Sequence, residues 1–114
     1  MLVVEDESLV RIDAAESLRE AGFEVLEAAD AREACEAVER RDDISVVFTD
    51  IEMPGGMNGL ELARWVTRAR PRVRLILTSG TARVDPKEIP DHGAFLSKPY
   101  SPEAVARTIR RLLA

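Results

Sequence analysis

With 114 residues, 46% of them hydrophobic, the chain is long enough to bury a core and has the size of one domain. Its net charge of -5 argues against direct binding to nucleic acid, and it has no apolar run of about 18 residues that could span a membrane. The amino terminus lacks the basic and apolar regions of a secretion signal, and a single cysteine cannot form a disulfide framework. We therefore expect a cytoplasmic protein without a membrane span.

The first half of the chain alternates short apolar runs with stretches of helical periodicity. The expected elements are a strand at 1–4, a helix at 8–21, a strand at 24–28, a helix from Asp30 to about Arg40 and a strand at 44–49. The first helix carries apolar residues at helical spacing, namely Leu9, Ile12, Ala15 and Leu18. Gly22 follows where a left-handed cap belongs, and Asp30 with Glu33 resembles a capping box.

The second half continues the alternation, with one irregular stretch. The expected elements are a helix from Asn58 through Arg70, a strand at 73–78, a strand at 94–97 and a helix from Ser101 through Leu113. Asn58 with Glu61 forms a second capping pattern, and Ser101 supplies a hydroxyl cap ahead of Pro102. Between Gly80 and Gly93 the apolar period is poor and prolines intervene, so we expect at most a short helix there.

Asp50 ends an apolar run that reads as a strand buried on both faces of a parallel sheet. In open α/β sheets, ligands bind outside the carboxyl ends of the strands, where this residue falls. An isolated acid at such a place more often caps a turn. Here, however, other apolar runs also end in polar residues, namely Glu5-Asp6-Glu7, Thr78-Ser79-Gly80 and Ser97-Lys98-Pro99.

If these strands are parallel neighbours, one edge of the sheet gathers acids, a hydroxyl and an ammonium around Asp50. Crowded carboxylates repel one another and favour a hard cation such as Mg²⁺. Lys98 and Ser79 would then supply positive charge and a hydrogen bond to phosphoryl oxygens. Strand alternation lets only one of the adjacent Thr78 and Ser79 face the site, and the following Gly80 favours Ser79.

At these positions the chain resembles the receiver domains of two-component response regulators, of the stand-alone, chemotaxis-regulator-like type. The resemblance covers essentially all 114 residues, which would form one receiver domain. Its markers are Glu5-Asp6, Asp50 followed by Met53-Pro54-Gly55 and Met57-Asn58-Gly59-Leu60-Glu61-Leu62, Ser79-Gly80, and Lys98-Pro99-Tyr100. It implies an α/β fold, a flavodoxin-like (βα)5 doubly wound parallel sheet with strand order 2-1-3-4-5. The short spacing between Ser79 and Lys98 predicts that the fourth helix is shortened or irregular.

The resemblance also implies a function: Asp50 accepts a phosphoryl group from a histidine kinase or a histidine phosphotransfer protein, with Mg²⁺ or Mn²⁺ as cofactor. The implied catalytic residues are Asp50, Ser79 and Lys98. The implied metal ligands are Asp6, Asp50, the backbone carbonyl of Glu52, and Glu5 acting mainly through water. Ser79 and Phe95 would form a switch that reshapes residues 80–100. We also expect any homodimer to form through the last helix and the fifth strand.

Two other functions remain open on the sequence. An acid two residues after Asp50 also occurs at the start of magnesium-dependent phosphohydrolases that use an aspartate nucleophile. Those enzymes generally need a second acid or a cap segment, which this chain does not supply. A phosphorylation-independent interaction module is disfavoured because the full set of acids, hydroxyl and lysine is present. A switch is therefore expected rather than a turnover enzyme.

Overall fold

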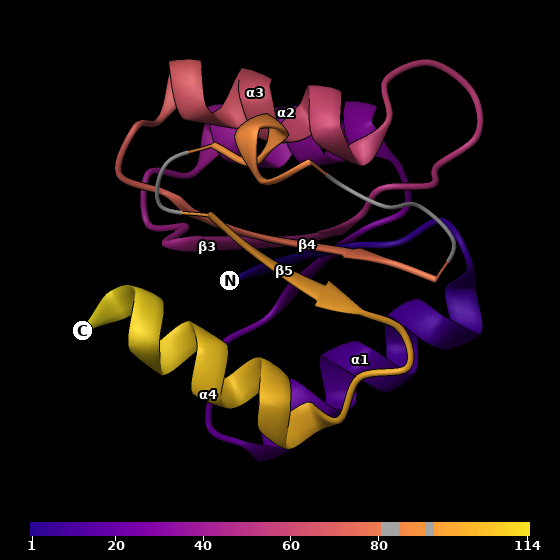
Figure 1. Ribbon diagram of the computed structural model, residues 1–114, viewed down its shortest axis with the longest axis vertical. Helices are drawn as coiled ribbons and strands as arrows, with labels where there is room; N and C mark the ends of the chain where they lie inside the picture. The colour runs from indigo at the N-terminus through magenta and orange to yellow at the C-terminus, as the bar shows by residue number, and fades with distance from the viewer. Residues whose placement is uncertain (81–84, 91–92) are drawn as a thin grey trace.

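Five parallel strands form a single sheet in the order β2-β1-β3-β4-β5. The structure is a computed structural model and describes residues 1–80, 85–90 and 93–114 (Figure 1). The strands are β1 (Leu2–Val4), β2 (Leu26–Ala28), β3 (Val46–Asp50), β4 (Arg74–Ser79) and β5 (Gly93–Ser97). The predicted strand order is confirmed, and each pair of neighbouring strands is parallel.

Helices cover both faces of the sheet, which makes the fold doubly wound. They are α1 (Ser8–Glu20), α2 (Ala31–Arg40), α3 (Gly59–Ala69) and α4 (Pro102–Leu113). Figure 1 shows α2 and α3 on one face and α1 and α4 on the other. The flavodoxin-like α/β architecture expected from the sequence is therefore confirmed.

The core consists of two layers because successive side chains of a strand point to opposite faces. Val47, Leu75 and Leu77 pack toward α2 and α3. Phe48 and Ile76 pack toward α1 and α4. Every residue of β3 is buried, so its apolar run has no alternating polar positions. This central strand holds its carboxyl end, and the acid there, in a fixed place.

The helix starts agree with the capping patterns in the sequence. Asn58 and Glu61 form a capping box at the start of α3. The Asp30 carboxylate accepts a hydrogen bond from the Glu33 backbone nitrogen at 2.8 Å. Ser101 likewise caps α4, its hydroxyl accepting from a backbone nitrogen at 3.1 Å. These local bonds satisfy donors that a helix leaves free at its first turn, which is why the starts were predictable.

The first turns of α1 depart from the sequence-based expectation of an apolar face. Ala15 and Leu18 are buried, but Leu9 is 78% exposed and Ile12 is 43% exposed. Helical spacing predicts which residues of α1 form an apolar stripe. Only the carboxyl-terminal part of this stripe, however, packs against the core. The exposed apolar side chains lie just after the acids that follow β1.

The segment between β4 and β5 contains one element within the described residues, a single 3-10 turn at Pro86–Glu88. The expectation of a shortened fourth helix is confirmed for this part of the chain. Residues 81–84 and 91–92, on which part of that expectation falls, lie outside the described residues. Ile89 and Phe95 are partly buried against the core on the α2 and α3 side. No helix in the described ranges has the length and apolar character needed to cross a membrane.

Candidate functional site

The residues that follow the apolar runs meet at the carboxyl edge of the sheet. Asp50 is the last residue of β3 and Ser79 the last residue of β4, one position further than the sequence predicted for each strand. Lys98 comes directly after β5, and Glu5 comes directly after β1. The structure thus brings together side chains that are up to 93 residues apart in the chain.

Asp50 is 5% exposed, and its carboxylate accepts two hydrogen bonds. Lys98 Nζ donates to its Oδ2 at 3.0 Å, and the backbone nitrogen of Glu52 donates to its Oδ1 at 3.3 Å. The Thr49 hydroxyl donates to the Asp50 backbone carbonyl at 3.0 Å. The Asp50 side chain therefore has a fixed orientation, and its carboxylate is in contact with the Lys98 ammonium.

Gly59, the first residue of α3, allows the helix to approach the end of β3. Its backbone nitrogen donates to the Ile51 carbonyl at 3.0 Å. A Cβ atom at this position would lie 2.7 Å from the Ile51 Cα and would overlap the Asp50 carbonyl oxygen. Because real Cβ atoms do not come so close, any larger residue must displace the strand end that carries Asp50.

Glu5 is a second buried acid, and its charge is incompletely balanced. It is 6% exposed, its Oε1 lies 3.5 Å from Lys98 Nζ, and its Oε2 accepts from the Glu7 backbone nitrogen at 3.2 Å. Burial, followed by a hydrogen bond with Asp6, raises the pKa of Glu5 to about 7. The nearby Lys98 ammonium lowers this pKa, but it does not outweigh the effect of burial.

Lys98 joins the two buried acids. Burial by itself lowers the pKa of its ammonium, but the hydrogen bond and charge of Asp50, and then those of Glu5, outweigh burial and raise it. The Lys98–Pro99 peptide bond is cis. Because its pKa is raised, Lys98 is a fully charged ammonium, and it lies between two carboxylates as the sequence pattern suggested.

The acids form a cluster whose chemistry fits a divalent cation. Glu5, Asp6 and Asp50 each offer a carboxylate oxygen, and these oxygens lie within 4.8 Å of one another. Glu5 and Asp50 are buried, whereas Asp6 is exposed, so the cluster has one side open to water. Hard oxygen ligands with room for water suit Mg²⁺. The raised pKa of Glu5 is consistent with a site that needs further positive charge.

Two hydroxyls at the end of β4 differ in their surroundings. Ser79 is 2% exposed, and its Oγ donates to Glu52 Oε1 at 2.5 Å. Thr78 is 3% exposed and is the neighbour of Asp50 in the sheet, but its hydroxyl has no hydrogen-bond partner in the part of the chain that the structure describes. The resemblance implied a role for the Glu52 carbonyl, but no sequence pattern indicated a role for its carboxylate. Only the pairing of β3 with β4 brings that carboxylate to Ser79.

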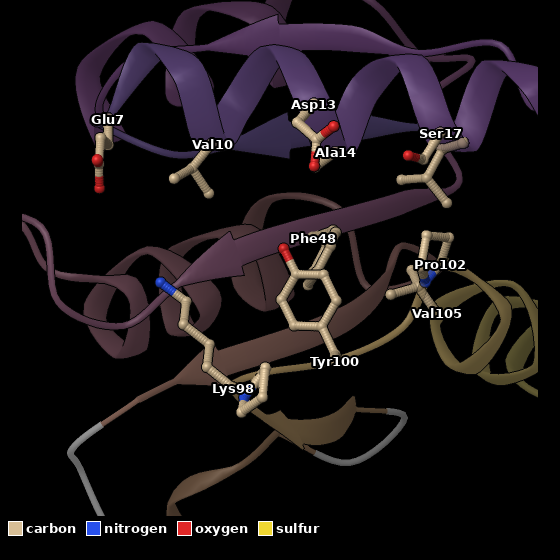
Figure 2. Close-up of a pocket in the computed structure, with 12 residues that line it drawn as sticks. Glu7, Val10, Asp13, Ala14, Ser17, Phe48, Lys98, Tyr100, Pro102 and Val105 are labelled. Atoms are coloured by element: carbon tan, nitrogen blue, oxygen red, sulfur yellow. The ribbon is translucent and has the colours of Figure 1, made fainter.

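A groove of about 520 Å³ runs from the site between α1 and the segment after β5. Figure 2 shows α1 on one side and Lys98, Tyr100 and Pro102 on the other. The Tyr100 ring meets the Phe48 ring edge-on, with centroids 5.3 Å apart. Burial raises the pKa of the Tyr100 hydroxyl. Because Lys98 borders both the groove and the acids, the groove opens onto the site.

Comparison with known proteins assigns the family. The sequence profile of the response regulator receiver domain matches residues 1–110, and the chain belongs to this family. It is therefore a receiver domain of two-component signal transduction, with the fold and the acidic edge that such a switch requires.

The chain is similar in sequence to parts of longer bacterial signalling proteins. Transcriptional regulatory protein PdtaR of Mycobacterium tuberculosis is 36% identical over 104 residues, which are 89% of this chain and 50% of PdtaR. Sensor kinase CckA of Brucella abortus is 33% identical over 117 residues, which are 99% of this chain and 12% of the kinase. The chain thus spans half or less of the length of these two relatives.

Among solved structures, one similar chain is response regulator protein TrrA of Thermotoga maritima, determined in complex with Mg²⁺-BeF. It is 27% identical, has a TM-score of 0.84, and the match covers 97% of this chain and 96% of TrrA.

Proposed function

We propose that Asp50 is the phosphoacceptor of this receiver domain, taking a phosphoryl group from a histidine kinase or a histidine phosphotransfer protein. The observation that carries the proposal is the setting of its carboxylate. It is buried, fixed by Lys98 Nζ at 3.0 Å and by the Glu52 nitrogen at 3.3 Å, and close to two other acids. A group fixed in this way can attack phosphorus without first being ordered.

In the proposed reaction, an oxygen of Asp50 forms a bond to phosphorus as the bond to the donor nitrogen breaks. Lys98 moves from the Asp50 carboxylate to a phosphoryl oxygen, and the Ser79 hydroxyl donates to another. The residues that would hold Mg²⁺ or Mn²⁺ are Asp6 and Asp50 through their carboxylates, Glu52 through its carbonyl, and Glu5 through water. A bound metal would supply positive charge that offsets repulsion between these acids and the incoming phosphoryl group.

Intact-mass measurement with acetyl phosphate tests the acceptor. The parent protein should gain one phosphoryl group when Mg²⁺ is present and none when a chelator is added. Asp50→Asn should gain none, whereas Asp42→Asn, a change at an exposed acid away from the site, should behave as the parent. Labelling that persists in Asp50→Asn, or that ignores the chelator, rules out the assignment.

We further propose that the domain is a switch and does not turn over substrate. A steady-state assay with a phosphate ester distinguishes it from a phosphohydrolase. At most one equivalent of phosphate per protein should be released, and only slowly, as expected of a phosphorylated switch. Continuous turnover that depends on Asp50 would instead support the hydrolase.

The exposed apolar residues of α1 support a proteinaceous phosphodonor. Leu9 is 78% exposed and Ile12 is 43% exposed, close in sequence to the acids of the site. Exposed apolar side chains beside a reactive group are typical of a partner-binding surface. Leu9→Ser should slow transfer from a phosphorylated histidine protein about tenfold, a loss expected for one apolar contact, and should leave labelling by acetyl phosphate unchanged. Equal slowing with both donors would contradict this role.

A further inference from the structure

The hydroxyl proton of Ser79 is already in use in the resting protein. Ser79 is 2% exposed, and its Oγ donates to the Glu52 carboxylate at 2.5 Å. A carboxylate is purely an acceptor, and a serine hydroxyl has only one proton to donate. The Ser79 hydroxyl therefore cannot donate to a phosphoryl oxygen on Asp50 until it leaves Glu52.

We propose that the Glu52 carboxylate is a resting-state latch, a positioning residue that holds the Ser79 hydroxyl and opposes activation. The inference rests on the function proposed above for Asp50. Glu52 is suited to this task because it contacts both Asp50 and Ser79. Its backbone nitrogen donates to Asp50 Oδ1 at 3.3 Å, while its carboxylate accepts the hydrogen bond of the Ser79 hydroxyl.

The latch acts by competition between two acceptors for one donor. A hydrogen bond to a charged acceptor is stronger than one to a neutral acceptor. Because the bond to Glu52 must break first, the protein has a lower apparent affinity for any group that needs the Ser79 hydroxyl. The phosphoryl oxygens offer a similar charged acceptor, so exchange is feasible. Glu52 itself is exposed, so its released carboxylate can be hydrated at little cost.

The position of Ser79 lets the latch act beyond the site. Its backbone carbonyl accepts from the Lys98 nitrogen at 3.0 Å, which links the end of β4 to the residue after β5. While Glu52 holds the side chain of Ser79, this link keeps its resting geometry. In this proposal the latch restrains the Ser79 hydroxyl and also the backbone hydrogen bond between Ser79 and Lys98, through which a movement of Ser79 would reach β5.

The first experiment needs neither metal nor phosphoryl group. Three-bond coupling constants of the Ser79 side chain are measured by NMR in chelator, in the parent, Glu52→Ala and the control Glu7→Gln. Glu7 is an exposed acid near the site whose side chain has no role in the latch. The parent and the control should show one staggered rotamer, and Glu52→Ala should show averaging. A single unchanged rotamer in Glu52→Ala overturns the proposal.

The second experiment measures binding of beryllofluoride, a phosphoryl mimic, at saturating Mg²⁺. Glu52→Ala should bind it about tenfold more tightly than the parent, as expected for release of one hydrogen bond to a charged group. Glu52→Gln, whose amide oxygen still accepts but carries no charge, should fall between them. Glu7→Gln, which removes one negative charge without touching Ser79, should match the parent.

A double-mutant cycle with Ser79→Ala separates the latch from simple charge repulsion. If Glu52 acts through the hydroxyl, Glu52→Ala has no effect on beryllofluoride binding in the Ser79→Ala background. The same gain in both backgrounds overturns the latch. Failure of the parent to bind beryllofluoride with Mg²⁺ contradicts the proposed function, whereas equal affinities of the parent and Glu52→Ala contradict the latch alone.

Discussion

Two buried threonines beside Asp50 differ in whether the hydroxyl finds a partner. The Thr49 hydroxyl donates to the Asp50 carbonyl at 3.0 Å, and the Thr78 hydroxyl has no partner among the residues that the structure describes. Both residues are nearly inaccessible, at 0% and 3% exposure. A buried hydroxyl without a partner costs free energy that a methyl group of the same shape does not.

The two threonines therefore predict opposite effects of the same substitution. Thr78→Val should raise the free energy of unfolding by about 1 kcal/mol, and Thr49→Val should lower it by a similar amount. Urea denaturation measures both changes. Because neither substitution touches Ser79, labelling of Asp50 should survive in Thr78→Val. A larger functional loss in Thr78→Val than in Ser79→Ala would mean that Thr78 is the switch hydroxyl.

Glu5 illustrates a conflict between stability and function at a single residue. Its pKa is raised from 4.5 to about 7 in the folded metal-free protein. Below about pH 4.5 the carboxyl is protonated in both the folded and the unfolded state. Between that pH and about 7 the unfolded chain loses the proton first, so stability falls as pH rises, and above 7 the penalty is complete.

Glu5→Gln should therefore be more stable than the parent at pH 8 in chelator, by about 2 kcal/mol. The difference should vanish near pH 4.5, and Glu7→Gln, which changes an exposed acid, should show no such dependence. Added Mg²⁺ should stabilise the parent more than Glu5→Gln. Unfolding curves recorded across pH measure these differences. A stability difference that is the same at both pH values would contradict the buried-charge explanation.

At the scale of elements, the contact between α3 and β3 sets the position of the acceptor. Gly59→Ala places a methyl group against the Asp50 carbonyl and 2.7 Å from the Ile51 Cα, so the helix and the strand must move apart. We expect a loss of about 2–3 kcal/mol in the free energy of unfolding, typical of overpacking, together with slower labelling of Asp50. Urea denaturation and intact mass measure these two effects.

Gly80→Ala is the matched control for this substitution. A Cβ atom at Gly80 would meet the nearest described atoms, in the Lys98 side chain, at 3.7 Å, which is an ordinary contact. Its stability should change by no more than about 1 kcal/mol. If both alanine variants lose stability equally, steric overlap at Gly59 does not explain the effect.

The elements were predictable where their signals are local. Capping residues such as Asn58 and Ser101 satisfy helix donors a few residues away, and the apolar run of β3 needs no other strand to be recognised. Contacts that depend on packing between elements were not predictable. The bond between Ser79 and Glu52 joins residues 27 apart, and the exposure of Leu9 depends on which part of α1 has a layer beneath it.

At the scale of the whole molecule, the two edge strands of the sheet, β5 and β2, differ in how they are connected to Ser79. The backbone bond from Lys98 to Ser79 connects the site to β5, where Phe95 is only partly buried against the core. Ile89, in the segment that precedes β5, is also only partly buried. β2 lies at the opposite edge, separated from β4 by β1 and β3. A movement at Ser79 should therefore reach β5 and not β2. That any homodimer would form through α4 and β5 stays a prediction.

Hydrogen exchange with and without Mg²⁺ and beryllofluoride tests this directional coupling. Amides of β5 and of Lys98 should change their opening free energy by about 1 kcal/mol, roughly fivefold in exchange rate, because partly buried elements rearrange at low cost. Amides of β2 should not change. Ser79→Ala should keep the response of the loop after Asp50 and lose the response of β5, since the hydroxyl that carries the signal is gone. A response confined to the loop around Asp50 in the parent would show that the signal leaves the site by another route.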